Sequence, residues 1–140
     1  DGSPDEKETA VIEGITAWMR INGEAIYETR PWKKFGEGPA IDNAAPLQAQ
    51  GFNEGKGAPF TAKDIRFTTK GNILYATLLG WPEDKTSLIK SLPEGPEKIG
   101  RVTLLGTSAP LAYNQTSEGL HVTLPNEPPC KDAYVLKIEK

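Results

Sequence analysis

The sequence predicts a mainly β protein: an antiparallel two-sheet β-sandwich of about seven or eight strands, preceded by one N-terminal amphipathic helix. Three observations support this prediction. Two β-rich runs meet at Lys70-Gly71-Asn72, where a glycine and an asparagine accept positive φ, as is typical of a hairpin. Short apolar runs separated by turn residues continue to the C-terminus. Near the N-terminus, apolar residues recur at the three- and four-residue spacing of a helix.

Length and composition restrict the class of protein. With 140 residues, 37% of them hydrophobic, the chain is long enough for one core and too short for two large ones. The net charge is -3 and the 16 basic residues are scattered among 19 acidic ones, which argues against nucleic-acid and membrane partners. No apolar run is long enough to span a membrane, and residues 1–4 lack the pattern of a signal peptide, so any secretion signal is expected upstream.

Metal and disulfide chemistry are not indicated either. The single cysteine, Cys130, has no disulfide partner, and one thiol with one histidine, His121, does not supply a zinc site. We therefore expect no metal and no cofactor. Cysteine usage leaves the cellular compartment open, because a domain without disulfides is compatible with either side of a membrane.

An amphipathic helix is predicted from Pro4 to about Arg20. Ser3 and Glu6 have the spacing of a capping box, and Pro4 occupies the first helical position, where its missing N–H costs nothing. Asn22-Gly23 ends the helix. The apolar stripe consists of Val11, Ile12, Ile15, Trp18 and Met19. Such a stripe needs a covering surface, which is either one end of the sandwich or a body of protein outside this sequence.

The segment after the helix has a weaker pattern. Residues 24–28 are interpreted as a short strand, whereas residues 30–59 are rich in glycine, proline and asparagine and show no sustained period. A structureless connection of that length is uncommon in a compact domain, so we expect undetected short strands or a mobile segment there. Trp32 and Phe35 are expected to anchor this segment to the surface.

The central hairpin pairs a half-buried strand with one that is apolar on both faces. In the first strand, Ile65 and Phe67 face one side and Arg66 and Thr68 the other. The faces of the second strand carry Ile73, Tyr75 and Leu79 on one side and Leu74, Ala76 and Leu78 on the other. One face fits the opposing sheet of a sandwich. The other needs the 30–59 segment, the initial helix or a further domain.

Five more strands are predicted after the hairpin, each bounded by turn residues. They cover residues 86–92, 99–105, 111–115, 120–124 and 133–138. The third and fourth of these form a second hairpin around Ser117-Glu118-Gly119. With the hairpin of residues 65–79 and the short run at 24–28, the total fits a sandwich.

No catalytic motif is visible. His121 lies between Leu120 and Val122 in a strand, so its side chain points away from the core, and a structural role is favoured. Cys130 is a loop thiol with only Lys131 as a neighbouring cation. The carboxylates are dispersed over turns, and their spacing does not establish a glycosidase pair. The glycines of residues 36–39 and 55–57 lack the context of a phosphate loop.

Aromatic residues are the remaining candidates for binding. Sandwich domains that bind sugars stack flat rings on pyranose faces, and the rings available here are Trp32, Trp81 and Tyr113. Packing is the favoured alternative for Trp81, which ends a strand before Pro82. Asn114-Gln115-Thr116 matches an N-glycosylation acceptor, which has meaning only in a secreted eukaryotic protein.

Several sequence motifs follow one another in a fixed order over nearly the whole chain. They are residues 15–32 with Asn-Gly-Glu-Ala-Ile-Tyr and Thr-Arg-Pro-Trp, residues 35–39, Asp64-Ile65-Arg66-Phe67-Thr68, Gly80-Trp81-Pro82, residues 102–106 and residues 133–138. Together they resemble the segment by which retaining α-L-fucosidases of glycoside hydrolase family 29 leave their catalytic barrel, followed by their C-terminal sandwich. Glu28, where members often have glycine, is a minor departure.

The resemblance implies two parts: residues 1–23, similar to the last helix of a catalytic (β/α) barrel, and residues 24–140, a C-terminal β-sandwich domain. It implies a non-catalytic domain that packs against the barrel of the same parent protein. That parent would hydrolyse terminal α-L-fucosyl linkages with retention, through two carboxyl groups of the barrel that have no counterpart here. We therefore assign no catalytic residue and expect the chain alone to be inactive.

An independent carbohydrate-binding module is the alternative function, with glycans as ligands. Family members are extracellular, periplasmic or lysosomal, and the resemblance implies no more than this about localisation.

Overall fold

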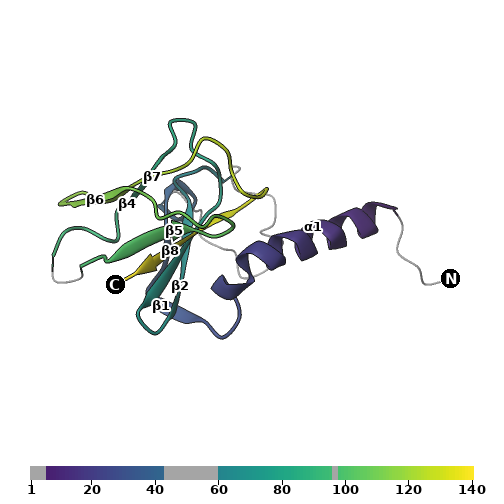
Figure 1. Cartoon of the computed structure of the whole chain (residues 1–140), viewed down its shortest axis with the longest axis horizontal. Coiled ribbons are helices and arrows are strands. Elements are labelled where there is room, and N and C mark those ends of the chain that lie inside the picture. The colour runs from purple at the N-terminus through teal and green to yellow at the C-terminus, as the bar shows by residue number, and fades with distance from the viewer. Residues whose placement is uncertain (1–5, 43–59, 96–97) are drawn as a thin grey trace, which may run out of the picture.

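The computed structural model describes residues 6–42, 60–95 and 98–140, which form one long helix followed by two antiparallel sheets (Figure 1). One sheet has five strands in the order β1-β2-β3-β8-β5 and the other has three in the order β4-β7-β6. The helices are α1 (Glu6–Asn22), the 3₁₀ turn η1 (Gly23–Ala25) and α2 (Pro39–Asp42). The strands are β1 (Arg30–Glu37), β2 (Ile65–Lys70), β3 (Ile73–Leu78), β4 (Thr86–Ile89), β5 (Arg101–Leu104), β6 (Tyr113–Thr116), β7 (Gly119–Thr123) and β8 (Tyr134–Glu139). The prediction of a helix followed by a two-sheet sandwich is confirmed.

Both predicted hairpins are present. Strands β2 and β3 pair from Ile65↔Leu78 to Lys70↔Ile73, and Gly71 in the connecting turn has φ +59, a conformation that glycine adopts without a steric penalty. Strands β6 and β7 pair up to Thr116↔Gly119. The capping residues Ser3 and Pro4 and the glycines of residues 55–57 lie outside the described residues.

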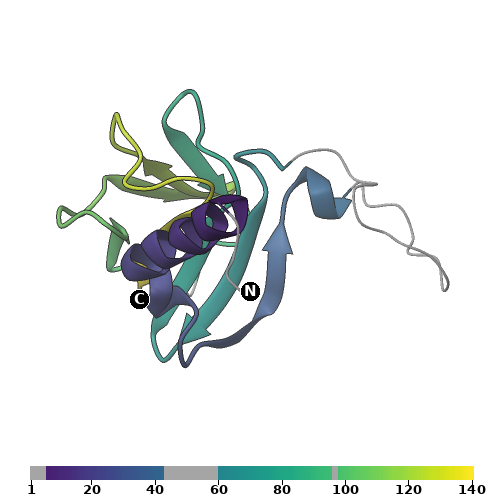
Figure 2. The same ribbon diagram turned by 90° about the vertical axis from the view of Figure 1, so that its right-hand side faces the viewer.

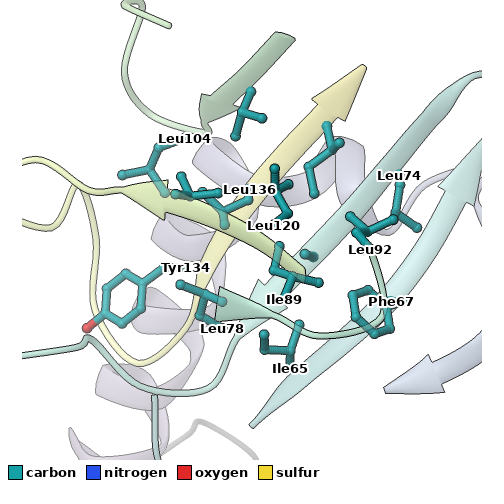
Figure 3. Close-up of a cluster of buried hydrophobic side chains, with 14 of the residues drawn as sticks. Ile65, Phe67, Leu74, Leu78, Ile89, Leu92, Leu104, Leu120, Tyr134 and Leu136 are labelled. Carbon is teal, nitrogen blue, oxygen red and sulfur yellow. The ribbon is translucent and has the colours of Figure 1, made fainter. Parts of the chain in front are cut away.

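The main core lies between the two sheets (Figure 3). Phe67, Ala76, Leu136 and Leu104 are successive Cα partners across β2, β3, β8 and β5, so their side chains share the inner face. Ile89 and Leu120, which are paired on β4 and β7, oppose them from the smaller sheet. Burying each of these large side chains contributes about 1.5–3 kcal/mol.

A second cluster covers the outer face of the five-stranded sheet. It contains Ala25, Tyr75, Leu105 and Val135, with Trp18, Ile21 and Ile73 packed around them. The C-terminal half of α1 and the turn η1 therefore cover the second apolar face of β3, as Figure 2 shows from the helix side. Of the three covers that the sequence left open, the initial helix is the one observed, and this face needs no body outside the chain.

Polar contacts fix the helix on that face. The indole Nε1 of Trp18 donates to the carbonyl of Ala133 at 2.9 Å, and the hydroxyl of Tyr75 donates to Glu24 Oε2 at 2.8 Å. Lys137 Nζ lies 3.0 Å from the same carboxylate oxygen. Burial alone would raise the pKa of Glu24, but the hydrogen bonds from Tyr75 and Lys137 outweigh it and lower that pKa.

The predicted strand at residues 24–28 is wrong. The chain continues from α1 into η1 and then turns, with Glu28 at φ 58. A strand is excluded there because Glu24 and Ala25 are held against the outer face of the sheet rather than beside a strand edge. The Ala25 carbonyl accepts from Thr68 Oγ1 at 2.8 Å.

The 30–59 segment contains a strand, as one of the two expectations for it required. Strand β1 pairs with β2, and its register shifts between Pro31 and Gly36, which hides the alternation in the sequence. Trp32 packs edge-on against Phe67 with ring centroids 5.0 Å apart, so its predicted anchoring role is confirmed. Phe35 is 63% exposed, and the expectation that it anchors the segment is wrong.

Two buried carboxylates hold the edge of the sandwich together. Glu37 accepts from the amides of Lys90 and Ser91, both at 2.9 Å, and so ties the end of β1 to the end of β4. Asp64 accepts from the amide of Ala40 at 2.7 Å and from the amide of Thr61 at 2.8 Å. Together they connect β1, α2, the start of β2 and β4.

We predict that Asp64→Asn lowers the free energy of unfolding by about 1–3 kcal/mol near neutral pH, because one of two buried amides loses a charged acceptor. Burial would raise the pKa of Asp64, but the hydrogen bonds from Thr61 and Ala40 dominate and lower it. A carboxyl whose pKa is lower in the folded chain stabilises it above the unfolded value of about 3.9, and this contribution is lost as the pH falls through the folded value.

Urea unfolding at about pH 7 and at about pH 2.5 measures this contribution. The difference between wild type and Asp64→Asn is expected to shrink at the acid pH, whereas the exposed control Asp132→Asn changes little at either. An undiminished difference at acid pH would contradict the assignment.

Candidate functional site

The most exposed apolar surface is the N-terminal half of α1. Val11, Ile12 and Ile15 are 62%, 55% and 59% exposed, whereas Trp18 and Met19 of the same stripe are half-buried. Figure 1 shows why: α1 extends well beyond the sheets, and only its C-terminal end packs against them. We call Val11, Ile12 and Ile15 the overhang. Large aliphatic side chains grouped in this way are typical of a surface that binds another protein surface.

The three aromatic candidates for a sugar platform lie on separate elements. Trp32 is on β1, Trp81 follows β3, and Tyr113 is on β6 at the edge of the smaller sheet. Trp32 packs on Phe67, and Trp81 packs on Tyr134 with centroids 4.9 Å apart. Tyr113 is 37% exposed and donates to the carbonyl of Ile99. No ring contact within the described part of the chain joins any two of the three.

A polar groove of about 1110 Å³ lies where the edges of the two sheets meet. Its basic side chains come from four elements: Lys34 on β1, Lys63 in the turn before β2, Lys90 directly after β4, and His121 on β7. Glu83 and Asp84, between β3 and β4, also line it. Sequence reasoning missed this site, because its residues are far apart in the chain and form no motif.

The two remaining candidates for chemistry have structural surroundings. The thiol of Cys130 donates to the carbonyl of Ala133 at 3.1 Å and accepts from Asn22 Nδ2 at 3.5 Å. Burial raises the pKa of Cys130, which disfavours the reactive thiolate. His121 Nε2 lies 3.2 Å from Thr116 Oγ1 and 3.9 Å from Glu118, both in its own hairpin. The interpretation of His121 as a half-exposed structural residue fits these contacts.

Two further searches covered only residues 6–42, 60–95 and 98–140. Nowhere in these ranges do three or more histidine, cysteine or acidic side chains gather as metal ligands would. The helices in the same ranges include none with the length and apolar character needed to cross a membrane.

Comparison with known proteins gives a consistent result. Residues 58–139 match the family model described as the alpha-L-fucosidase C-terminal domain. The chain is 31% identical to tissue alpha-L-fucosidase of Rattus norvegicus over 131 residues, which is 90% of this chain and 23% of that protein. It is 29% identical to the alpha-L-fucosidase of Branchiostoma floridae, covering 91% of this chain and 24% of that protein.

Solved structures share the fold. The crystal structure of Thermotoga maritima alpha-fucosidase with a mechanism-based inhibitor superposes with a TM-score of 0.70 at 22% identity, covering 100% of this chain and 28% of that one. The alpha-L-fucosidase isoenzyme 1 of Paenibacillus thiaminolyticus superposes with a TM-score of 0.62 at 21% identity, covering 99% of this chain and 28% of that one. The chain thus spans about a quarter of the length of the proteins it matches.

We predict that Trp81→Ala lowers the free energy of unfolding by about 2–3 kcal/mol, because it removes a half-buried ring that packs on Tyr134. Tyr113→Ala, at an exposed edge, is expected to cost less than about 1 kcal/mol. Denaturant titration of both variants makes the comparison. Unchanged stability of Trp81→Ala together with lost glycan binding would instead favour the sugar platform.

Proposed function

Because this chain belongs to the family of alpha-L-fucosidase C-terminal domains, we propose that it is the non-catalytic C-terminal domain of an α-L-fucosidase. Its role is to pack against the catalytic domain of the same parent protein, which hydrolyses terminal α-L-fucosyl linkages with retention. The division into residues 1–23, as the end of a catalytic barrel, and residues 24–140, as the sandwich, belongs to this proposal.

The overhang carries the proposal. One apolar stripe runs along α1, and the sheet covers only its C-terminal half. Burying three aliphatic side chains that are now exposed would contribute about 1.5 kcal/mol or more each. The matched fucosidases are about four times as long as this chain, so in them the corresponding domain is joined to a much larger body. A catalytic domain is therefore the occupant that we propose for the overhang.

A carbohydrate-binding module is our second proposal. It would use the rings of Trp32, Trp81 and Tyr113, and the exposed ring of Tyr113 is the observation that favours it. The two proposals differ in what they require of the overhang: docking on a catalytic domain needs it, whereas glycan binding by the isolated chain does not.

We predict that Ile15→Asp changes the unfolding free energy of the 140-residue chain by no more than about 0.5 kcal/mol, because the side chain is exposed in it. In the parent polypeptide that also carries the catalytic domain, the same change is expected to lower the midpoint of thermal inactivation by several degrees. Differential scanning fluorimetry of both forms gives the comparison.

Ala17→Asp is the matched control, since Ala17 is exposed and lies away from the apolar stripe. It is expected to have the same small effect in both forms. Equal effects of Ile15→Asp and Ala17→Asp in the parent polypeptide would rule out docking through the overhang.

We also expect the isolated chain not to hydrolyse an aryl α-L-fucoside. Release of the aryl alcohol above the uncatalysed rate, followed by absorbance, is the measurement. Turnover that survives repurification would overturn the assignment as a non-catalytic domain.

A further inference from the structure

We propose that the polar groove binds an acidic oligosaccharide, that is, a saccharide carrying sulfate or carboxylate groups. Lys34, Lys63 and Lys90 supply the cationic contacts, and hydroxyl and carboxylate side chains beside them supply contacts to sugar hydroxyls. Neither the match to the family model nor the relatives' names assign a ligand to this groove.

The lysines carry unbalanced charge. Within the described parts of the chain, Lys34, Lys63 and Lys90 take part in no ion pair, whereas Lys70 and Lys137 each contact a glutamate. Cations gathered around one groove repel one another, and this repulsion is relieved when an anion binds between them. The arrangement therefore favours a ligand with at least one negative group.

Two buried carboxylates fix the positions of these lysines. Glu37 accepts from the amide of Lys90, which sets the end of β4, with Lys90, beside the β1 strand that carries Lys34. Gly38 has φ +124, and a Cβ there would lie 2.4 Å from the carbonyl oxygen of Lys63, so the turn after β1 packs directly on the Lys63 segment. Asp64 holds the same segment to α2 through Ala40. A groove whose walls are fixed in advance loses less conformational entropy on binding.

The remaining lining points to a saccharide rather than to a simple polyanion. Glu83 and Asp84 also face the groove, and they would repel an extended polyanion but accept hydrogen bonds from sugar hydroxyls. Thr61 and Thr86 add hydroxyl groups, and Leu88 offers an apolar surface for a sugar ring. The chain as a whole has a net charge of -3, so non-specific attraction of polyanions is not expected.

The groove and the overhang are on different sides of the molecule. Leu88 and His121 are Cα partners on β4 and β7 and line the groove from the smaller sheet. The helix α1 packs on the outer face of the five-stranded sheet, away from β4 and β7 (Figure 1). Saccharide binding in the groove therefore does not depend on the proposed docking function, and each is tested without the other.

Isothermal titration of the 140-residue chain at low ionic strength tests the proposal. The probes are a heparin-derived tetrasaccharide, tetragalacturonic acid and neutral maltotetraose, which separate sulfate, carboxylate and uncharged ligands. We expect saturable binding of at least one acidic probe, weakened by added salt, and at least tenfold weaker binding of maltotetraose.

The triple variant Lys34→Gln, Lys63→Gln, Lys90→Gln is expected to reduce the affinity for the acidic probe at least tenfold. Its control is Lys70→Gln, Lys98→Gln, Lys131→Gln, which makes the same change in net charge at exposed lysines outside the groove and should change the affinity less than twofold. Circular dichroism melting curves establish that both variants fold.

Three results would overturn the proposal. They are no saturable binding of either acidic probe, an equal loss of affinity in the control variant, and binding of poly-glutamate as tight as that of the acidic saccharides. The last result would leave an anion site but contradict a saccharide ligand.

Discussion

The structure depends on the burial of β3 on both faces. This strand is in the middle of the five-stranded sheet, between β2 and β8, and its side chains alternate between the inter-sheet core and the cluster under α1. Leu74, Ala76 and Leu78 require the smaller sheet, whereas Ile73 and Tyr75 require the helix. Removing either cover would expose apolar side chains on the central strand, so the domain is effectively a three-layer arrangement of helix, sheet and sheet.

Charged side chains organise the places where apolar packing ends. At the helix, Glu24 joins Tyr75 and Lys137 on the outer face of the sheet. At the opposite edge, Glu37 and Asp64 bind main-chain amides of segments that are distant in sequence. Buried carboxylates of this kind are stabilising only when their acceptor sites are filled, and amide donors fill them here. The second arrangement also positions the lysines of the groove.

The strands of the sandwich were largely predictable, because alternation and turn residues act over a few neighbouring positions. Gly71-Asn72 and Ser117-Glu118 mark both hairpins directly. The strand β1 was not recognised because its register shift breaks the alternation, and residues 24–28 were misassigned because a β-like composition was read without a neighbouring strand. The groove was unpredictable in principle: the Glu37–Ser91 contact spans 54 residues of sequence, and no local pattern encodes it.

The helix anchor at Trp18 has a consequence for the orientation of anything bound to the overhang. Because the indole bonds the Ala133 carbonyl and Asn22 is fully buried one turn later, the direction of α1 relative to the sheets is fixed by its own C-terminal end. A neighbour seated on Val11, Ile12 and Ile15 would be joined to the sandwich by a stiff strut, not by a flexible tether. The angle between the two bodies would then be encoded in the seat of one tryptophan.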